Sequence, residues 1–459
     1  MIQLRRYQHG LVDGIRAAFM ASIKRVLAVS PTGSGKTIIF CYLAMATRAK
    51  GKRVYILVHR DELVEQVSET LRKFDVQHGV IASGRHPTPS PVQVCSVFTL
   101  VNRLDDWPVP DMVIVDEAHH ASKGSTWTRI FERWAAAYVL GVTATPMRLD
   151  GKPLSGHFDH MVMGPTPGEL MESGDLCPYV MYAPPMAIGK LKKRMGDYAS
   201  ADLSREMDKP QLVGNAVEHY KALAAGKRAI VFCVSLEHAL NTAVAFHEAG
   251  FTAARIDGGL DRGARRALVE RFTRGEIKVL TSCELVSEGF DLPAIEVCIL
   301  MRPTASLALY LQQVGRALRP FPGKDKAIIL DHAGNSGNHG LPDDDREWFL
   351  DGEQGAKRKT AVKDSLSQCG KCYAYLKRGS MACVHCGFTW QAEGRKLDEA
   401  AGELEAIDTS VVKPVRSPEQ VAARREVGMA KNLDELMAIA HSRGYKPGWA
   451  NHVWATRKR

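Results

Sequence analysis

The chain has 459 residues, of which 45% are hydrophobic and 24% charged, so it can form two or three globular domains of ordinary size. No apolar run approaches the roughly 18 residues that a membrane span needs. Residues 1–10 are polar and basic, unlike a signal peptide, so we expect a cytoplasmic protein that makes no use of a membrane. The net charge of +10 favours a polyanionic partner, because each Lys or Arg placed on a phosphate releases condensed counterions, although a solvated basic face would give the same charge.

Short runs rich in Val, Ile and Leu alternate with stretches of helical periodicity in the first part of the chain. They predict strands at residues 26–30, 54–58, 92–97, 112–115 and 139–142. The same pattern returns at residues 229–234, 254–257, 278–282, 297–301 and 327–330. Continuous apolar strands separated by helices are typical of parallel sheets covered on both faces. We therefore predict two α/β domains, residues 1–165 and 210–345, joined by a linker or insert at residues 166–209.

A loop of small residues follows the first predicted strand and precedes a helix. It reads Ser30-Pro31-Thr32-Gly33-Ser34-Gly35-Lys36-Thr37. Small residues let backbone N–H groups curl around a phosphate, and the amino terminus of the helix adds positive potential. In such a loop Lys36 would neutralise the β- and γ-phosphates of a nucleotide and Thr37 would bind Mg²⁺. The sequence therefore predicts an ATP site.

A second acidic element, Asp116-Glu117-Ala118-His119, stands at the end of the strand predicted at residues 112–115. Mg²⁺ prefers a hard carboxylate, which Asp116 supplies. Hydrolysis also needs a base that orients the attacking water, a role that fits Glu117. His119 is more typical of a coupling residue than of a catalyst.

Four of the ten cysteines are clustered, whereas the other six stand singly on apolar stretches, a pattern that fits a reducing compartment. The cluster is Cys369-x-x-Cys372 and Cys383-x-x-Cys386, and its two pairs can close a tetrahedral Zn²⁺ site with no open position. We expect a zinc ribbon at residues 346–392. The aromatic and basic residues near the cysteines would bind DNA by stacking and charge. Alternatively, the metal would only stabilise a segment too small to have its own hydrophobic core.

Together these motifs resemble those of the superfamily 2 helicases of the DEAD/DEAH-box type. The phosphate loop, Asp-Glu-Ala-His and Thr143-Ala144-Thr145-Pro146 look like motifs I, II and III, and residues 287–291 and 312–319 look like motifs V and VI. The stretch 300–335 is similar to RadD-type and phage-encoded helicases, which points to a bacterial or phage-infected cell. The resemblance implies two tandem RecA-like domains, ATP and Mg²⁺ as cofactors, and DNA as the preferred partner, with RNA as an alternative.

The resemblance also implies roles for single residues. Arg316 and Arg319 would act as arginine fingers from the second domain, and Gly289 and Asp291 would line the same cleft. Near the amino terminus, Arg5 and Gln8 look like the adenine-recognition motif. The nucleic-acid strand would be held mainly through its phosphates. Its candidate contacts are His59, Arg60, Ser96, Thr99, Ser235, Thr281 and Ser282.

Residues 393–459 are expected to form a linker and a small basic helical module, which would contact nucleic acid or a replication or repair protein. Three functions compete for the whole chain: a DNA helicase or single-strand translocase, a duplex translocase that never separates strands, and a nucleic-acid scaffold with a dead ATPase. Intact Lys36, Glu117 and Arg316 argue against the scaffold. We find no nuclease constellation, which disfavours a self-contained restriction enzyme.

Overall fold

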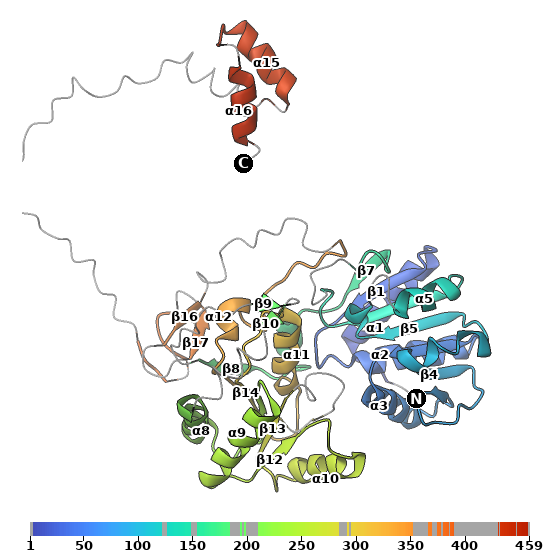
Figure 1. The fold of residues 1–459 in the computed structure, drawn as a ribbon, viewed down its shortest axis with the longest axis vertical. Helices are drawn as coiled ribbons and strands as arrows, with labels where there is room; N and C mark the ends of the chain where they lie inside the picture. Colours follow the sequence, from blue (N-terminus) through green and yellow to red (C-terminus); the bar gives the residue numbers. More distant parts are fainter. Residues whose placement is uncertain are drawn as a thin grey trace, which may run out of the picture. The chain divides into compact units, whose positions relative to one another are not determined.

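The computed structural model consists of two compact units, residues 1–390 and 391–459, which are considered separately (Figure 1). It describes residues 3–121, 126–147, 154–183, 193–194, 197–198, 210–283, 292, 295–351, 366–369, 374–377, 380–384, 386–389, 430, 432–446 and 448–457. Among these residues no helix has both the length and the apolar composition that crossing a bilayer requires.

The first domain is built on a seven-stranded parallel sheet of order β3-β4-β2-β5-β6-β1-β7. Its strands are β1 (Arg25–Val29), β2 (Val54–Val58), β3 (Gly79–Ile81), β4 (Val92–Ser96), β5 (Met112–Asp116), β6 (Tyr138–Thr143) and β7 (His160–Met163). All five strands predicted for this domain are confirmed. The two that sequence reasoning missed, β3 and β7, are short strands at the two edges of the sheet, where a continuous apolar run is not required.

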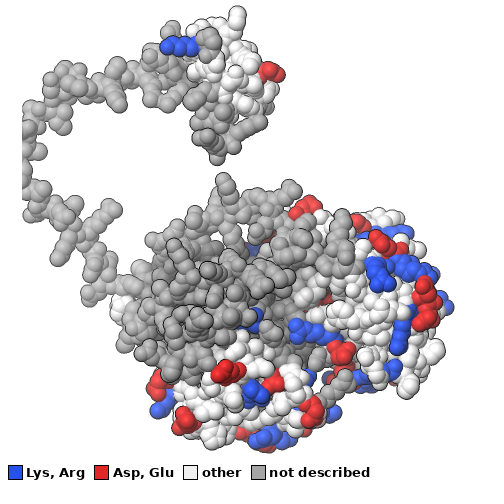
Figure 2. Space-filling model, in the orientation of Figure 1, with Lys and Arg blue, Asp and Glu red and all other residues white. Residues whose placement is uncertain are grey.

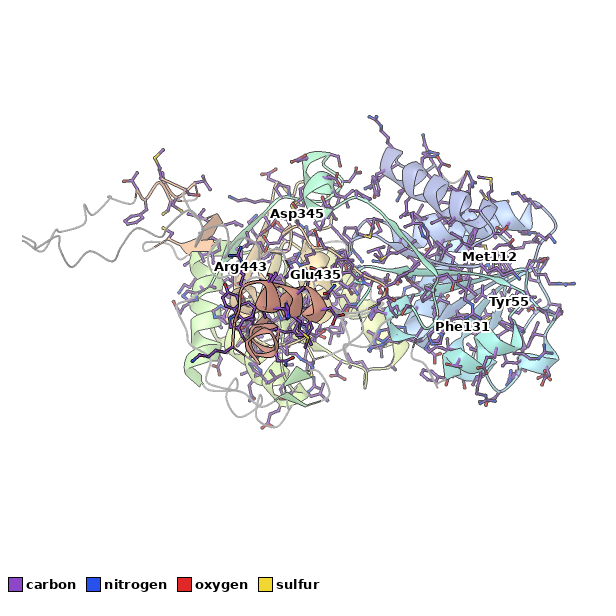
Figure 3. All side chains as sticks on the ribbon, turned by 90° about the horizontal axis from the view of Figure 1, so that it is seen from above. Tyr55, Met112, Phe131, Asp345, Glu435 and Arg443 are labelled. Atoms are coloured by element: carbon purple, nitrogen blue, oxygen red, sulfur yellow. The ribbon has the colours of Figure 1, made fainter. Side chains whose placement is uncertain are left out.

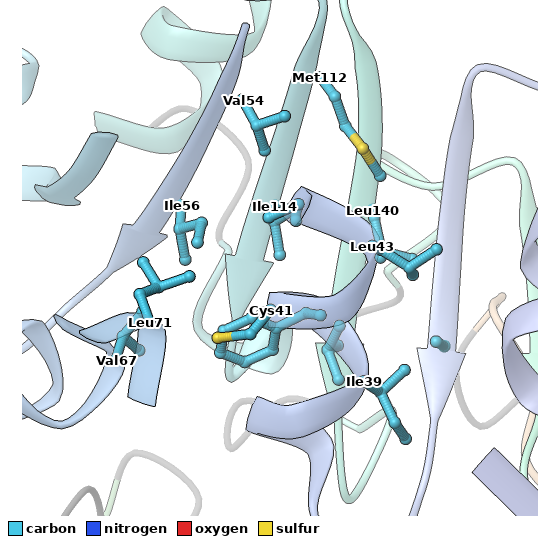
Figure 4. Close-up of a cluster of buried hydrophobic side chains, with 14 of the residues drawn as sticks. Ile39, Cys41, Leu43, Val54, Ile56, Val67, Leu71, Met112, Ile114 and Leu140 are labelled. Atoms are coloured by element: carbon cyan, nitrogen blue, oxygen red, sulfur yellow. The ribbon is translucent and has the colours of Figure 1, made fainter. Parts of the chain in front are cut away.

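Helices cover both faces of this sheet. They are α1 (Arg6–Met20), α2 (Lys36–Arg48), α3 (Asp61–Lys73), α4 (Val97–Leu100) and α5 (Thr126–Arg133), with the short 3-10 helices η1 (Leu104–Asp106) and η2 (Ala118–His120). Successive residues of a strand point to opposite faces of the sheet, so they pack in two different hydrophobic clusters. Ile56, Met112 and Ile114 pack with α2 and α3 in one cluster, drawn in Figure 4. Tyr55 packs with Phe131 of α5 in the other, and Figure 3 shows these two on the opposite side of the sheet from Met112.

The second domain repeats this design with a six-stranded parallel sheet of order β12-β13-β11-β14-β15-β8. Its strands are β8 (Tyr179–Tyr182), β11 (Ala229–Phe232), β12 (Ala253–Ile256), β13 (Val279–Ser282), β14 (Val297–Leu300) and β15 (Ala327–Asp331). Its helices are α6 (Pro167–Glu172), α8 (Pro210–Ala224), α9 (Leu236–Glu248), α10 (Arg262–Thr273), α11 (Leu307–Ala317) and α12 (Asn335–His339). All five predicted strands are confirmed, and the sixth, β8, comes from the segment that the sequence suggested was a linker.

Two small antiparallel ribbons complete the first unit: β9 (Lys193–Arg194) with β10 (Asp197–Tyr198), and β16 (Leu366–Gln368) with β17 (Tyr375–Lys377). A bridge between Tyr182 and Ala374 joins the second ribbon to β8 at the edge of the large sheet. In the second unit α15 (Leu433–Ser442) packs against α16 (Trp449–Arg457) through Leu436 and Ile439, as the helical spacing predicted.

Gly141 in β6 generates a prediction about stability. A Cβ at this position would overlap the buried Phe158 ring and lie 2.9 Å from the Cβ of Ala118. Because overpacking a core forces its neighbours to shift, Gly141→Ala should lower the free energy of unfolding by about 1–3 kcal/mol. Urea denaturation of the purified protein measures this change.

Gly10 supplies the matched control. It lies in α1, and a Cβ added there would meet no atom of another described element within 4 Å. Gly10→Ala should be neutral or stabilising by up to about 1 kcal/mol, since alanine loses less backbone entropy on folding than glycine. Equal effects of the two substitutions would contradict the packing that we describe around Gly141.

Candidate nucleotide site and nucleic-acid track

The phosphate loop lies between β1 and α2, as the sequence predicted. Gly33 and Gly35 have φ values of 90° and 75°, which side chains with a Cβ rarely adopt. The Ser30 hydroxyl donates to Ser34 Oγ at 2.7 Å, and Lys36 Nζ lies 3.5 Å from the Pro31 carbonyl. The first turn of α2 therefore opens onto a loop built for close approach of an anion.

The amino terminus of α1 is fastened to this loop. Gln8 Nε2 donates to the Ser34 carbonyl at 3.1 Å, and the Tyr7 hydroxyl donates to the same oxygen at 2.7 Å. The Arg5 amide donates to Gln8 Oε1 at 2.9 Å, and the Arg5 guanidinium pairs with Asp175 at 2.9 Å. The Gln8 amide is thus engaged by protein groups beside the phosphate loop, and its contact with adenine stays a prediction.

Asp116 and Glu117 stand at the carboxyl end of β5, next to the phosphate loop. Asp116 is 5% exposed, and burial, followed by the charge of Glu117, raises the pKa of its carboxyl to about 7 although Lys36 acts in the opposite direction. Glu117 has a φ of 48°, and its amide donates to Asp116 Oδ1 at 3.0 Å. Burial also lowers the pKa of Lys36, against the charges of Glu117 and Asp116. The site therefore holds desolvated groups of both signs that a metal–phosphate complex can pair with.

Thr143, at the end of β6, joins this acidic turn to the phosphate loop. Its hydroxyl accepts from His119 Nδ1 at 3.0 Å and donates to the Thr145 carbonyl at 3.0 Å. Its carbonyl accepts from the Ser30 amide at 3.0 Å. His119 Nδ1 also lies 3.3 Å from Glu117 Oε2, so the three motifs share one hydrogen-bonded network.

Helix α11 of the second domain lies directly on the phosphate loop. A Cβ at Gly315 would lie 2.6 Å from Thr32, and a Cβ at Gly33 would lie 3.4 Å from Arg319 Cγ. Arg316 is buried, and the charges of Arg319 and Arg316 both act to lower the pKa of Lys36. Both predicted arginine fingers therefore lie at the helix that covers the nucleotide loop.

Lys324 holds the carboxyl end of α11, and sequence reasoning missed it. Its Nζ donates to the carbonyls of Ala317, Ile295 (2.8 Å) and Arg319 (2.9 Å), which uses all three ammonium donors. Burial lowers the pKa of this ammonium to about 8. The sequence gives one signal for this role of Lys324. The residue follows a helix and a Pro-Gly turn, and cations favour the carboxyl termini of helices.

Residues 346–351 return from the second domain to the first. The Leu350 carbonyl accepts from the amides of Leu154 (3.0 Å) and Ser155 (3.0 Å), while Trp348 packs against the core of the second domain. A cavity of about 80 Å³ lies between the domains, beside Thr32 and Gly315 and lined on one side by this segment. The sequence suggested that the zinc ribbon begins at residue 346, but this part serves the motor domains.

The predicted nucleic-acid contacts of the first domain follow strand ends. His59 and Arg60 come directly after β2, Ser96 is the last residue of β4, and Thr99 lies in α4. All four are on the same domain as the phosphate loop. Figure 2 shows Lys and Arg interspersed with Asp and Glu over the described part of the face in view, so no single basic patch dominates that face.

The contacts expected in the second domain differ in exposure. Ser235 is half-buried and caps α9 by accepting from the His238 amide at 3.0 Å. Thr281 and Ser282 are buried, and the Thr281 hydroxyl donates to the Ala239 carbonyl at 2.7 Å. In this conformation Thr281 therefore supports the core instead of facing a phosphate, and its contact with a strand stays a prediction. Gly289 and Asp291 lie outside the described residues.

Three of the four clustered cysteines come together, while Cys372 lies outside the described residues. The sulfur atoms of Cys369, Cys383 and Cys386 all lie within 4.8 Å of one another, and those of Cys369 and Cys386 are 3.6 Å apart. A tetrahedral site with Zn–S distances of about 2.3 Å has sulfur–sulfur edges of about 3.8 Å. The Gly387 amide donates to the Cys383 carbonyl at 2.8 Å in a tight turn. The described thiols therefore fit Zn²⁺.

Comparison with known proteins agrees with this site. Residues 1–148 match the family described as "Type III restriction enzyme, res subunit", and residues 209–320 match "Helicase conserved C-terminal domain". A 51.5 kDa protein of a Lactococcus phage (isolate 7-9) is 36% identical over 389 residues, which cover 84% of this chain and 82% of the phage protein. IRC3 of Saccharomyces cerevisiae, named as an ATP-dependent helicase, is 29% identical over 357 residues. That match covers 72% of this chain but only 52% of the yeast protein.

Solved structures support the fold alone, because the sequence identities are low. A fragment assigned as the HsdR subunit of a type I restriction enzyme from Vibrio vulnificus matches with a TM-score of 0.59 and 21% identity. The match covers 74% of this chain and 66% of the fragment. Two RecA-like domains with the phosphate loop, the Asp-Glu-Ala-His turn and motif VI in one cleft, together with these relatives, identify the family. The chain belongs to the superfamily 2 helicases, ATP-dependent enzymes that unwind nucleic acids or translocate on them.

Proposed function

We propose that this protein is a DNA-dependent ATPase that couples hydrolysis to movement along DNA or to its unwinding. The observation that carries the proposal is the convergence of Lys36, Asp116 and Glu117 of the first domain with Arg316 and Arg319 of the second. Such a site is complete only when the two domains close, and closure is the movement that a motor needs.

The residues of the chain have separate tasks in hydrolysis. ATP supplies the phosphoryl group that passes to water, and Mg²⁺ neutralises its oxygens when bound. Lys36 and the loop amides hold the phosphates, and Thr37 and Asp116 offer oxygen ligands of the kind that Mg²⁺ prefers. Glu117 orients the attacking water and accepts its proton. Arg316 and Arg319 stabilise the charge that develops in the transition state.

An ATP-dependent RNA helicase, dbp3 of Sclerotinia sclerotiorum, is 23% identical over 339 residues, but other similar proteins favour DNA over RNA. They include the type I restriction enzyme EcoKI endonuclease subunit of Escherichia coli at 24% identity. They also include the protein named DNA 3'-5' translocase XPB2 of Sulfurisphaera tokodaii, at 24% identity. The second name, a translocase, is also consistent with the alternative of a duplex translocase that does not separate strands. Strand displacement on forked, tailed and blunt DNA, beside RNA equivalents, distinguishes the modes.

The catalytic carboxylate gives the first test of this function. Glu117→Gln should keep nucleotide binding but lower the DNA-stimulated turnover of ATP by about 10² or more, because the amide cannot accept the proton of water. Lys36→Ala should instead weaken nucleotide binding, measured with a fluorescent ATP analogue. Glu248→Gln, an exposed carboxylate of the second domain, is the control and should turn over normally. Full turnover in Glu117→Gln would remove this residue from the mechanism.

The arginines test whether the second domain completes the site. Arg316→Ala or Arg319→Ala should leave nucleotide affinity within a few-fold and remove most of kcat, since their contacts strengthen in the transition state. Arg266→Ala is a control, because this exposed arginine of α10 pairs with Glu270 of the same helix at 3.1 Å. An unchanged kcat in both Arg316→Ala and Arg319→Ala would show that hydrolysis needs no help from α11.

We further propose that Cys369, Cys372, Cys383 and Cys386 bind one structural Zn²⁺. The Zn²⁺ would be structural rather than catalytic, since four thiolate ligands leave no open coordination position. The attachment of the ribbon to β8 supports a staple at the edge of the second motor sheet. The ribbon would then either grip DNA or fix the carboxyl-terminal part of the unit.

Elemental analysis of reduced, chelator-free protein should find one Zn²⁺ per chain. Cys383→Ser should release the Zn²⁺, because three thiolates bind it too weakly to keep this segment folded around the metal. Cys283 lies outside the cluster, so Cys283→Ser should retain the Zn²⁺. ATP hydrolysis without DNA should largely survive. If Cys383→Ser binds DNA more weakly and with a shallower salt dependence, the ribbon contacts DNA phosphates. If DNA affinity is unchanged and only the sensitivity to protease rises, the Zn²⁺ has a purely structural role. Protein without zinc would contradict the site.

A further inference from the structure

Three histidine rings lie in a row between the predicted nucleic-acid track and the catalytic turn. The ring centroids of His59 and His120 are 4.2 Å apart at an interplanar angle of 39°, and those of His120 and His119 are 4.2 Å apart at 38°. His59 follows β2, which pairs in parallel with β5 from Val54 opposite Met112 to Leu57 opposite Val115. The parallel register therefore brings His59 to the edge of the sheet where the Asp-Glu-Ala-His turn begins.

The row ends on catalytic groups. His119 Nδ1 lies 3.0 Å from Thr143 Oγ1 and 3.3 Å from Glu117 Oε2. The η2 turn carries both His119 and His120, and the His120 amide donates to the Glu117 carbonyl at 3.0 Å, so His120 is joined directly to the backbone of Glu117. The other end of the row is His59, whose neighbour in the chain, Arg60, is the N-cap residue of α3 and a predicted phosphate contact. A contiguous set of contacts thus joins the two sites.

We propose that His120 is a positioning residue that transmits the binding of a nucleic-acid strand at His59 and Arg60 to the orientation of Glu117. This inference rests on the proposed function, because it concerns how nucleic acid accelerates hydrolysis. His120 touches neither the nucleotide nor the strand in this role. Its ring is half-buried, so its removal leaves a smaller packing defect than the loss of a core aromatic residue.

The His120 ring would act through its shape and its contacts with the two neighbouring rings. The rings are tilted by 39° and 38° with centroids 4.2 Å apart, so each ring limits the movement of its neighbour by direct contact. When a phosphate orders the loop after β2, the His59 ring becomes fixed and restricts His120. His120 in turn restricts His119, whose hydrogen bond to Thr143 sets the geometry of the turn. A flat aromatic side chain at position 120 should therefore preserve the coupling.

The test compares full-length wild type with His120→Ala and His120→Phe. For each we measure kcat with and without saturating single-stranded DNA, KM for ATP, and DNA affinity by fluorescence anisotropy. His120→Ala should lower the ratio of stimulated to basal kcat by about fivefold or more, with KM and DNA affinity within about threefold of wild type. His120→Phe should recover at least half of the ratio. His160→Ala, an exposed histidine of the same domain, is the matched control.

A double-mutant cycle adds a second readout. If His59 and His120 act in one path, His59→Ala/His120→Ala should have a ratio no lower than His59→Ala alone, because the second change removes nothing further. A normal ratio in His120→Ala, a loss that His120→Phe does not restore, or additive effects in the cycle would each overturn the relay. Loss of DNA affinity in His120→Ala would overturn it too, by making His120 a direct contact. If no nucleic acid stimulates wild type, the proposed function itself fails.

Discussion

Thr143 connects the parts of the nucleotide site on which the rest of the structure depends. Its carbonyl accepts from the Ser30 amide at the start of the phosphate loop, and its hydroxyl accepts from His119 of the acidic turn. It can do both because β6 lies between β1 and β5 in the parallel sheet. All three strands end at one edge, so residues far apart in the chain meet within hydrogen-bonding distance. Thr143 thus links the phosphate loop through its carbonyl to the acidic turn through its hydroxyl.

The second domain places further positive charge beside the phosphate loop. Lys36 is desolvated, and the opposing charges of Asp116 and Glu117 stabilise its ammonium. Arg316 and Arg319 approach from α11 and its carboxyl end, which Lys324 fixes. Burying so many charges together is costly unless a partner compensates them, and a metal–phosphate complex would supply that partner. The Leu350 carbonyl accepts from two amides of the first domain and so adds a contact between the domains.

The cysteine ribbon is part of the motor rather than an appendage to it. Tyr182 at the edge of the second sheet pairs with Ala374 between the cysteine pairs, so the cysteine-bearing turns are joined to a motor strand. An edge strand exposes unpaired backbone groups, and covering it protects the sheet from pairing with other chains. The ribbon therefore has a structural task at this edge whether or not it also contacts DNA.

The sequence by itself determined the nucleotide chemistry and most of the sheet. Central strands such as β2 and β14 are buried on both faces, so their continuous apolar runs can be recognised in the sequence. The phosphate loop is recognised by its glycines, which it needs because the backbone adopts positive φ there. The edge strands β3, β7 and β8 escaped because a strand with one neighbour needs no continuous apolar run. Only the tertiary structure decided that Lys324 holds α11, that Thr281 supports the core, and that His59, His120 and His119 form one row. Thr281 and His59 depend on contacts between segments distant in the chain, and Lys324 depends on how its side chain folds back onto carbonyls five and seven residues before it. None of these contacts leaves a periodic pattern in a single sequence.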